Sequence, residues 1–251
     1  MIVMGILNVT PDSFADGGRH NDFEAAVIHG HEMLAEGVDI IDIGGESTKP
    51  GVERVSEEEE LARVIPVIKE LAKTGARISI DTMRASTARA AIKAGAQIIN
   101  DVSGGLADPE MLPTAAQLGV PYIAMHWRGH SKDMNSRAVY GDVVTDVISE
   151  LQERVSAALD AGINKNNLII DPGIGFAKDA HHNWEIIDSI EEFVALGYPV
   201  LVGGSRKRFL GGDNPDEREA ATIELTKRLS TSGIWGVRVH SVKAHKDVLS
   251  S

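Results

Sequence analysis

One stretch decides the fold: Leu168-Ile169-Ile170-Asp171-Pro172-Gly173-Ile174-Gly175-Phe176. Its branched apolar residues predict a strand that is buried on both faces, as strands of parallel sheets are. The carboxylate, proline and glycines that follow predict a loop at the carboxyl end of that strand. Asp171 is therefore expected where a parallel strand meets a ligand-binding loop.

The same pattern recurs along the whole chain. Strands are predicted for residues 2–9, 38–43, 78–80, 96–99, 120–125, 168–170, 199–202 and 234–239. The segments between them show helical spacing over 22–36, from 56, over 85–94, 109–118, 142–161 and 182–196, from 205, and over 216–229, and a short helix is predicted over 243–251. This alternation predicts an α/β fold, a single-domain TIM (β/α)8 barrel over residues 1–251. An open, doubly wound sheet is the alternative, and it would place a site where the strand order reverses.

Composition narrows the class of protein. A chain of 251 residues with 43% hydrophobic content can bury the core of one barrel. Cysteine is absent, which excludes disulfides and thiolate metal sites and leaves oxygen or imidazole ligands for any metal. The net charge of −12 argues against non-specific nucleic-acid binding. With no signal peptide and no apolar run of membrane-spanning length, a cytoplasmic protein without a membrane partner is expected.

Polar residues stand at the predicted carboxyl ends of the strands, where a barrel of this type carries its active site. Singly, each of them could be a turn residue or a helix cap. Together they predict one site, made of Asn8, Thr48, Asp81, Asn100, Asp101, His126, Asp171, Ser205, Lys207, Arg238 and His240.

The residue types indicate what the site could bind. Asp81 and Asp171 suit a flat heterocycle with adjacent N–H donors, because a carboxylate accepts two parallel hydrogen bonds. Asn100 can donate and accept, which fits the mixed edge of the same ring. Two basic clusters, residues 206–208 and Arg238 with His240 and Lys243, would each be a solvated surface if taken alone. Lys207, Arg238 and His240 are expected to supply charge for a phosphate group, and the helix predicted from Ser205 to direct its amides at a second anion.

Eight ordered motifs lie at the predicted strand ends: Gly5-Ile6-Leu7-Asn8-Val9-Thr10-Pro11-Asp12-Ser13-Phe14, Asp42-Ile43-Gly44-Gly45-Glu46-Ser47-Thr48, Ile80-Asp81-Thr82, Asn100-Asp101-Val102-Ser103-Gly104-Gly105, Met125-His126, Asp171-Pro172-Gly173-Ile174-Gly175-Phe176, Ser205-Arg206-Lys207 and Arg238-Val239-His240. In these motifs the chain resembles the dihydropteroate synthase family, and the resemblance extends over residues 4–242. It implies a TIM barrel that joins 6-hydroxymethyl-7,8-dihydropterin diphosphate to 4-aminobenzoate with Mg²⁺ and releases pyrophosphate. It also implies a homodimer and a sulfonamide target.

The resemblance further implies roles for particular residues. The pterin would be held by Asp81, Asn100, Asp171 and Lys207, with Met125 packing nearby and Arg238 stacking on the ring. Pyrophosphate and Mg²⁺ would be met by Asn8, Arg238 and His240. The 4-aminobenzoate pocket would be lined by Phe14, Thr48, Phe176 and the start of the helix predicted from Ser205. His126 is expected to be structural, since Met125 is the pocket residue.

The chain departs from the family at three places. Lys49 stands where the family usually has arginine, so the charge is kept and the planar fork is lost. Arg208 stands where many members have serine, and Ser241 replaces a common aspartate.

Two other functions remain open: a pterin-binding methyltransferase domain of the methyltetrahydrofolate-corrinoid type, and a silent paralogue that binds pterin or serves as a structural partner. The segment 205–207 and the motif that ends at Phe14 favour the synthase.

Overall fold

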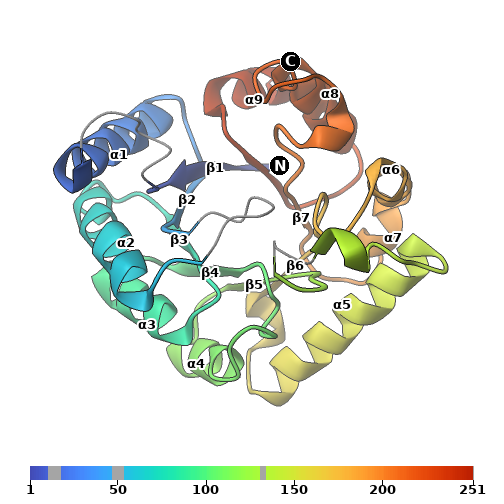
Figure 1. Ribbon diagram of the computed structural model, residues 1–251, viewed down its shortest axis with the longest axis horizontal. Coiled ribbons are helices and arrows are strands. Elements are labelled where there is room, and N and C mark those ends of the chain that lie inside the picture. Colours follow the sequence, from blue (N-terminus) through green and yellow to red (C-terminus); the bar gives the residue numbers. More distant parts are fainter. Residues whose placement is uncertain (11–17, 47–53, 131–133, 251) are drawn as a thin grey trace.

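The computed structural model describes residues 1–10, 18–46, 54–130 and 134–250, and it forms a parallel barrel (Figure 1). The strands are β1 (Ile2–Asn8), β2 (Ile40–Gly44), β3 (Ile78–Asp81), β4 (Ile98–Asp101), β5 (Tyr122–Met125), β6 (Leu168–Asp171), β7 (Leu201–Val202) and β8 (Gly236–Val239). Their order in the sheet is β6-β5-β4-β3-β2-β1-β8-β7. A single parallel bridge between Ile170 and Val200 joins β6 to the entry of β7 and closes the ring. The TIM barrel is confirmed, and the open doubly wound sheet is wrong.

Helices surround the strands (Figure 1). They are α1 (Gly18–Ala35), α2 (Glu57–Ala72), α3 (Ala85–Ala94), α4 (Met111–Leu118), α5 (Val143–Asp160), α6 (Ala180–Asp188), α7 (Ile190–Val194), α8 (Glu219–Leu229) and α9 (Val242–Leu249), with short 3-10 turns at Met134–Arg137, Lys165–Asn167 and Arg208–Leu210. In the part of the chain that the structure describes, no helix has the length and apolar character of a membrane span.

The interior of the barrel is built in layers. Its floor is an apolar cluster of Met4, Ile40, Ile98, Ile123, Ile169 and Leu201. Side chains two positions apart on a strand point to the same face. Four side chains therefore point inward two positions after a residue of the floor: Asp42 after Ile40, Asn100 after Ile98, Met125 after Ile123 and Asp171 after Ile169. A largely polar layer therefore lies directly on an apolar floor, at the carboxyl end of the strands.

Two expected helices are wrong. No helix begins at Ser205, because Arg206 has a left-handed φ of 57° and Lys207 is extended. The turn is held instead by α8, where the Thr222 hydroxyl accepts from the Arg206 amide at 3.1 Å and Glu219 accepts from the Arg206 guanidinium at 2.7 Å. The helix expected over 182–196 is divided into α6 and α7, because Ser189 leaves the helical conformation.

Candidate active site

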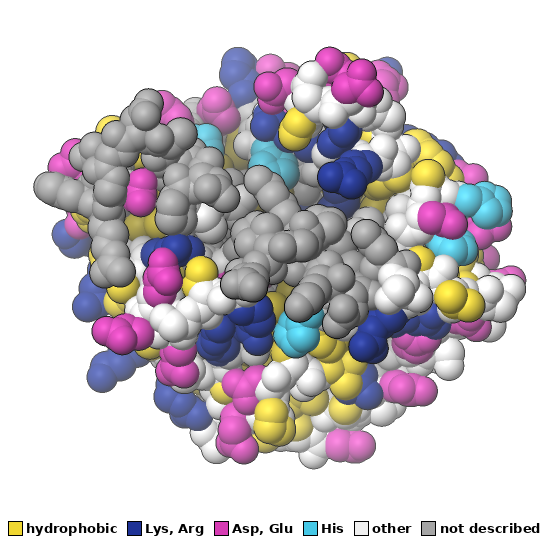
Figure 2. Space-filling model, in the orientation of Figure 1, with side chains coloured by type: hydrophobic (Ala, Val, Ile, Leu, Met, Phe, Trp, Pro, Cys, Tyr) yellow, Lys and Arg dark blue, Asp and Glu magenta, His cyan; other side chains and the backbone are white. Residues whose placement is uncertain are grey.

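The carboxyl ends of the strands face the viewer in Figure 1, and the same face is shown with its atoms in Figure 2. Lys and Arg side chains stand next to the centre of this face, while Asp and Glu side chains lie mostly toward its edge (Figure 2). A protein with a strongly acidic composition therefore presents basic groups around the mouth of its barrel. Such a local field favours an anionic ligand.

Arg238 on β8 is the centre of the polar layer. Its Nε donates to Asp42 Oδ2 at 2.6 Å, and a terminal nitrogen donates to Asp81 Oδ2 at 2.7 Å. Asp42 Oδ2 also accepts from Asn100 Nδ2 at 2.9 Å. Asp42 is fully buried, and its Oδ1 has no partner among the described residues. Four residues from four strands are thus linked into one network across the barrel.

The carboxyl groups of this layer have raised pKa values. Burial raises the pKa of Asp81 to about 7; Arg238 opposes the rise, and the nearby charge of Asp42 adds to it. Burial also raises the pKa of Asp171, against the hydrogen bond from the Gly173 amide and the charge of Lys207. A carboxyl group that is costly to ionise is stabilised when a ligand donates hydrogen bonds to it.

Lys207 reaches the site from the turn after β7. Its ammonium donates to the Ile174 carbonyl and lies 4.4 Å from the centre of the Phe176 ring. Burial lowers the pKa of Lys207 to about 8, although the charge of Asp171 raises it. The Gly173 amide donates to Asp171 Oδ1 at 2.7 Å. Asp171, Lys207 and Phe176 therefore meet around one loop, as expected.

Three further predicted residues, Ser205, His240 and Asn8, lie at the rim. Ser205 Oγ is 2.9 Å from His240 Nδ1 and accepts from the His240 amide at 3.2 Å. Asn8 ends β1, and its Oδ1 would lie 3.7 Å from a Cβ placed on Gly44. The same Cβ would lie 3.5 Å from Asp81 Cβ, so the glycine leaves open the space between Asn8 and Asp81.

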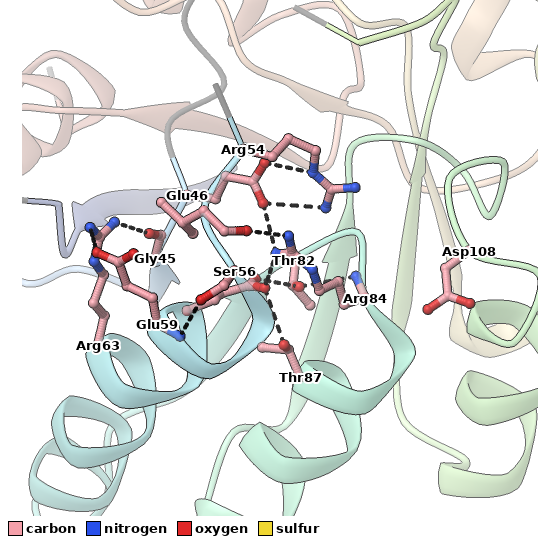
Figure 3. A network of polar contacts seen from close by, with 12 residues as sticks. Gly45, Glu46, Arg54, Ser56, Glu59, Arg63, Thr82, Arg84, Thr87 and Asp108 are labelled. Carbon is pink, nitrogen blue, oxygen red and sulfur yellow. Dashed lines mark hydrogen bonds and ion pairs between the residues drawn. The ribbon is translucent and has the colours of Figure 1, made fainter. Parts of the chain in front are cut away.

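A second network of charged groups supports the side of the site next to Asp81 (Figure 3). Glu60 on α2 is fully buried, and it accepts from the Thr82 hydroxyl at 2.6 Å and from the Arg84 guanidinium. Arg84 also donates to Glu46 Oε2 at 2.9 Å, just after β2. The residues that follow β2 and β3 are therefore held together by buried ion pairs, and the charge of Glu60 contributes to the raised pKa of Asp81.

Some expected residues lie elsewhere. Asp101 faces outward from β4 and accepts from Ser103, Gly105 and Tyr122, so it shapes a loop instead of the site. Arg206 and Lys243 pair with residues of α8 and α9, which leaves only part of each basic cluster at the site. Phe14, Thr48 and Lys49 lie outside the described residues.

Asp42 and Lys178 are buried charged residues of the site region that were not among the predicted site residues. Asp42 could have been predicted, because a carboxylate two positions after Ile40, inside an apolar strand, signals an inward-facing polar group. Lys178 resembles an ordinary loop lysine, yet it is 8% exposed. No sequence signal distinguishes it, because its burial depends on loops that come together only in the fold.

Comparison with known proteins agrees with this geometry. A family model described as pterin binding enzyme matches residues 4–240. The dihydropteroate synthase of Mycobacterium leprae (strain TN) is 50% identical over 257 residues, covering 98% of this chain and 90% of the relative. The solved structure of Xanthomonas albilineans dihydropteroate synthase with 4-aminobenzoic acid has a TM-score of 0.94 and 45% identity, and covers 99% of this chain and 90% of that chain. A structure of the Xanthomonas albilineans enzyme in complex with 7,8-dihydropteroate has a TM-score of 0.90 and 42% identity, with 99% and 91% covered.

A barrel with an apolar floor, inward carboxylates and a lysine beside them has the groups that a pterin needs, and the chain is a member of the pterin-binding enzymes. Within that class it belongs to the dihydropteroate synthase family.

Proposed function

We propose that this enzyme condenses 6-hydroxymethyl-7,8-dihydropterin diphosphate with 4-aminobenzoate, with the pterin held by Asp81, Asn100, Asp171 and Lys207. The observation that carries the assignment of residues is the polar layer on the apolar floor. A flat ring can lie with one face on Met125, which is 4% exposed, while its edge meets buried acceptors. The N–H donors of the ring would satisfy carboxylates that are otherwise costly to bury.

The reaction breaks the bond between the pterin methylene carbon and the diphosphate oxygen and forms a bond from that carbon to the arylamine nitrogen. The nitrogen then loses one proton, and pyrophosphate leaves. An arylamine is neutral at pH 7, so it needs positioning more than deprotonation, and we assign no general base. Asp81 and Asp171 stabilise positive charge that develops on the pterin.

Arg238 and His240 are proposed to receive the leaving group. Asp42 and Asp81 occupy only part of the N–H donors of the Arg238 guanidinium, and no other residue that the structure describes accepts from it, so donors remain for a ligand. His240 lies at the rim with Ser205. We also propose that Phe176 and Ser205, with Phe14 and Thr48, line the 4-aminobenzoate pocket.

The residues fit a Mg²⁺ ion that arrives with the diphosphate. Mg²⁺ takes oxygen ligands, keeps several waters and is commonly held by one or two protein groups together with substrate phosphates. Asn8 offers one amide oxygen, and the described residues contain no group of three His, Cys, Asp or Glu side chains that could hold a metal. When bound, the ion would neutralise charge on the departing pyrophosphate. We further propose a homodimer, which the resemblance to the family supports, and a cytoplasmic location, as expected from the sequence.

Product formation tests the reaction. The protein with both substrates and Mg²⁺ is expected to yield 7,8-dihydropteroate and pyrophosphate in equal amounts, and chelation of Mg²⁺ is expected to slow turnover. Chromatography of the pterin product and a coupled pyrophosphate assay measure both. Tight binding of the dihydropterin substrate with no product would instead indicate a silent paralogue.

The pKa values of the site predict a bell-shaped pH profile. Asp81 accepts hydrogen bonds best when ionised, and Lys207 carries charge only when protonated. Because their pKa values are about 7 and about 8, kcat/KM for the dihydropterin substrate is expected to fall below about pH 7 and above about pH 8. In Lys207→Arg the residual activity should keep the lower limb and lose the upper one, since a guanidinium stays protonated. An upper limb that is unchanged in this variant would assign it to another group.

A further inference from the structure

Lys178 is a buried lysine that the reaction described above does not use. Its Nζ donates to the carbonyl oxygens of Gly173 and Phe176, each at 3.1 Å, and lies 2.8 Å from His126 Nδ1. The ammonium group is therefore contacted by two backbone carbonyl oxygens and one imidazole nitrogen. Burial lowers the pKa of Lys178 well below its usual value, so this placement is costly.

The loop that Lys178 holds has an unusual backbone. Gly173, Gly175 and Ala177 have φ values of 68°, 77° and 48°, so every second residue is left-handed. Ala177 has no glycine freedom there, and the left-handed region costs an L residue roughly 1–2 kcal/mol. The Tyr140 hydroxyl donates to the Ala177 carbonyl at 2.9 Å. The conformation is therefore imposed by contacts from outside the loop, with Lys178 at its centre.

A chain of polar groups fixes Lys178 from the outer side. His126 Nε2 lies 2.9 Å from Glu150 Oε2, and Glu150 pairs with Arg128. Since Glu150 is an acceptor, the histidine carries its proton on Nε2 and leaves Nδ1 to accept from Lys178. Burial and the charge of Lys178 lower the pKa of His126 to about 4, which keeps it neutral at pH 7. Arg128 lies 3.8 Å from the centre of the Tyr140 ring. Because the Tyr140 hydroxyl donates to the Ala177 carbonyl, this series of contacts ends at the same loop.

The inner side of the same loop contacts Lys207. The Ile174 carbonyl accepts from the Lys207 ammonium, and the Phe176 ring lies beneath it. A Cβ on Gly175 would come within 2.5 Å of Lys207 Cδ, so the stem of this lysine runs directly against the loop backbone. The two lysines hold carbonyl groups of one loop: Lys178 contacts those of Gly173 and Phe176 from outside, and Lys207 contacts that of Ile174 from the site.

We propose that Lys178 is a positioning residue for the reaction: it holds residues 172–177 in the one shape that places Lys207 and Phe176 for the substrates. This inference rests on the proposed function, because it assigns Lys207 and Phe176 to substrate binding. It adds a residue that touches neither substrate and acts through the loop backbone.

A double-mutant cycle tests the proposal. Lys178→Met keeps the unbranched stem of the side chain and removes its terminal donor group, and a loop displaced in this way is expected to lower kcat/KM for the dihydropterin substrate by roughly 100-fold. In a Lys207→Met background, the same change is expected to lower it by less than about threefold, because Lys207, the residue through which the loop acts on the dihydropterin substrate, is gone. Lys93→Met, at an exposed position on α3, is the control and should leave kcat/KM unchanged.

The outcomes separate the possibilities. An equal loss in both backgrounds, or a lower melting temperature with unchanged KM values, would give Lys178 a structural role only and overturn the proposal. If Lys178→Met does not fold, Tyr140→Phe removes the hydrogen bond to Ala177 and keeps the ring under Arg128. Its expected effect is a rise of about fivefold in the KM values, and unchanged values would also overturn the proposal. Absence of product from the intact protein would instead count against the proposed function.

Discussion

Alanine at Lys207 is expected to lower kcat/KM for the dihydropterin substrate by about 100- to 1000-fold, the usual cost of removing one preorganised charge from an active site. The lysine contacts Ile174 and Phe176 in the loop after β6, on the side of the loop that faces the site. Its removal would take away one of the positive charges that offset the burial of Asp171, so that the pKa of Asp171 would rise further. Asp171→Ala is expected to produce a loss of the same order by removing the acceptor itself. Steady-state kinetics of product formation measure both.

Lys165→Ala is the control for this experiment. Lys165 lies on the outside of the barrel, with its ammonium 5.3 Å from the centre of the Tyr198 ring. It should leave kcat/KM within about twofold of the starting value, as surface changes usually do. A similar small effect of Lys207→Ala would remove Lys207 from the site.

Methionine at Arg238 is expected to destabilise the folded protein by about 3–5 kcal/mol near pH 8, because it leaves Asp42 and Asp81 buried without their cation. Both carboxylates lie within 2.7 Å of the guanidinium in the intact protein. The charge of Arg238 lowers the pKa of Asp81, so in the variant this pKa would rise above about 7. The folded variant would then bind more protons than the unfolded chain, and its stability would increase as the pH falls.

Urea unfolding at pH 5 and pH 8 measures this difference. The gap between the variant and the intact protein should be smaller at pH 5, where Asp81 is protonated. Arg228→Met is the matched control, since Arg228 pairs with Asp188 where both side chains are at least half exposed. Such a surface pair contributes at most about 1 kcal/mol. An equal loss at both pH values in Arg238→Met would show that packing, and not charge, explains the effect.

The fold could be predicted because its signal is local and repeated. Each strand is a short apolar run that ends in a polar residue, and eight such units leave a closed barrel as the simplest arrangement. The helix expected from Ser205 failed for a non-local reason: Thr222 and Glu219, which lie in α8, stabilise a left-handed Arg206. No feature of the sequence around residue 206 predicts these contacts with α8.

The site was predicted unevenly. Asp81, Asn100, Asp171 and Lys207 follow from their places at strand ends, and the structure brings them together. Their partners do not follow in the same way, because the link from Arg238 to Asp42 joins residues 196 positions apart. At the departure Ser241, the hydroxyl accepts from the Arg206 guanidinium at 2.9 Å.

The ring of strands has one weak join. Between β6 and β7 the pairing is reduced to the bridge from Ile170 to Val200, where the Ile170 amide donates to the Pro199 carbonyl at 2.9 Å. Asp171 lies directly after the join on one side, and Lys207 follows it on the other. Amide hydrogens at this join would exchange with solvent through a small local opening, before the rest of the sheet separates. A pterin held by both Asp171 and Lys207 would span the join, so that substrate binding would itself complete the barrel and slow that exchange.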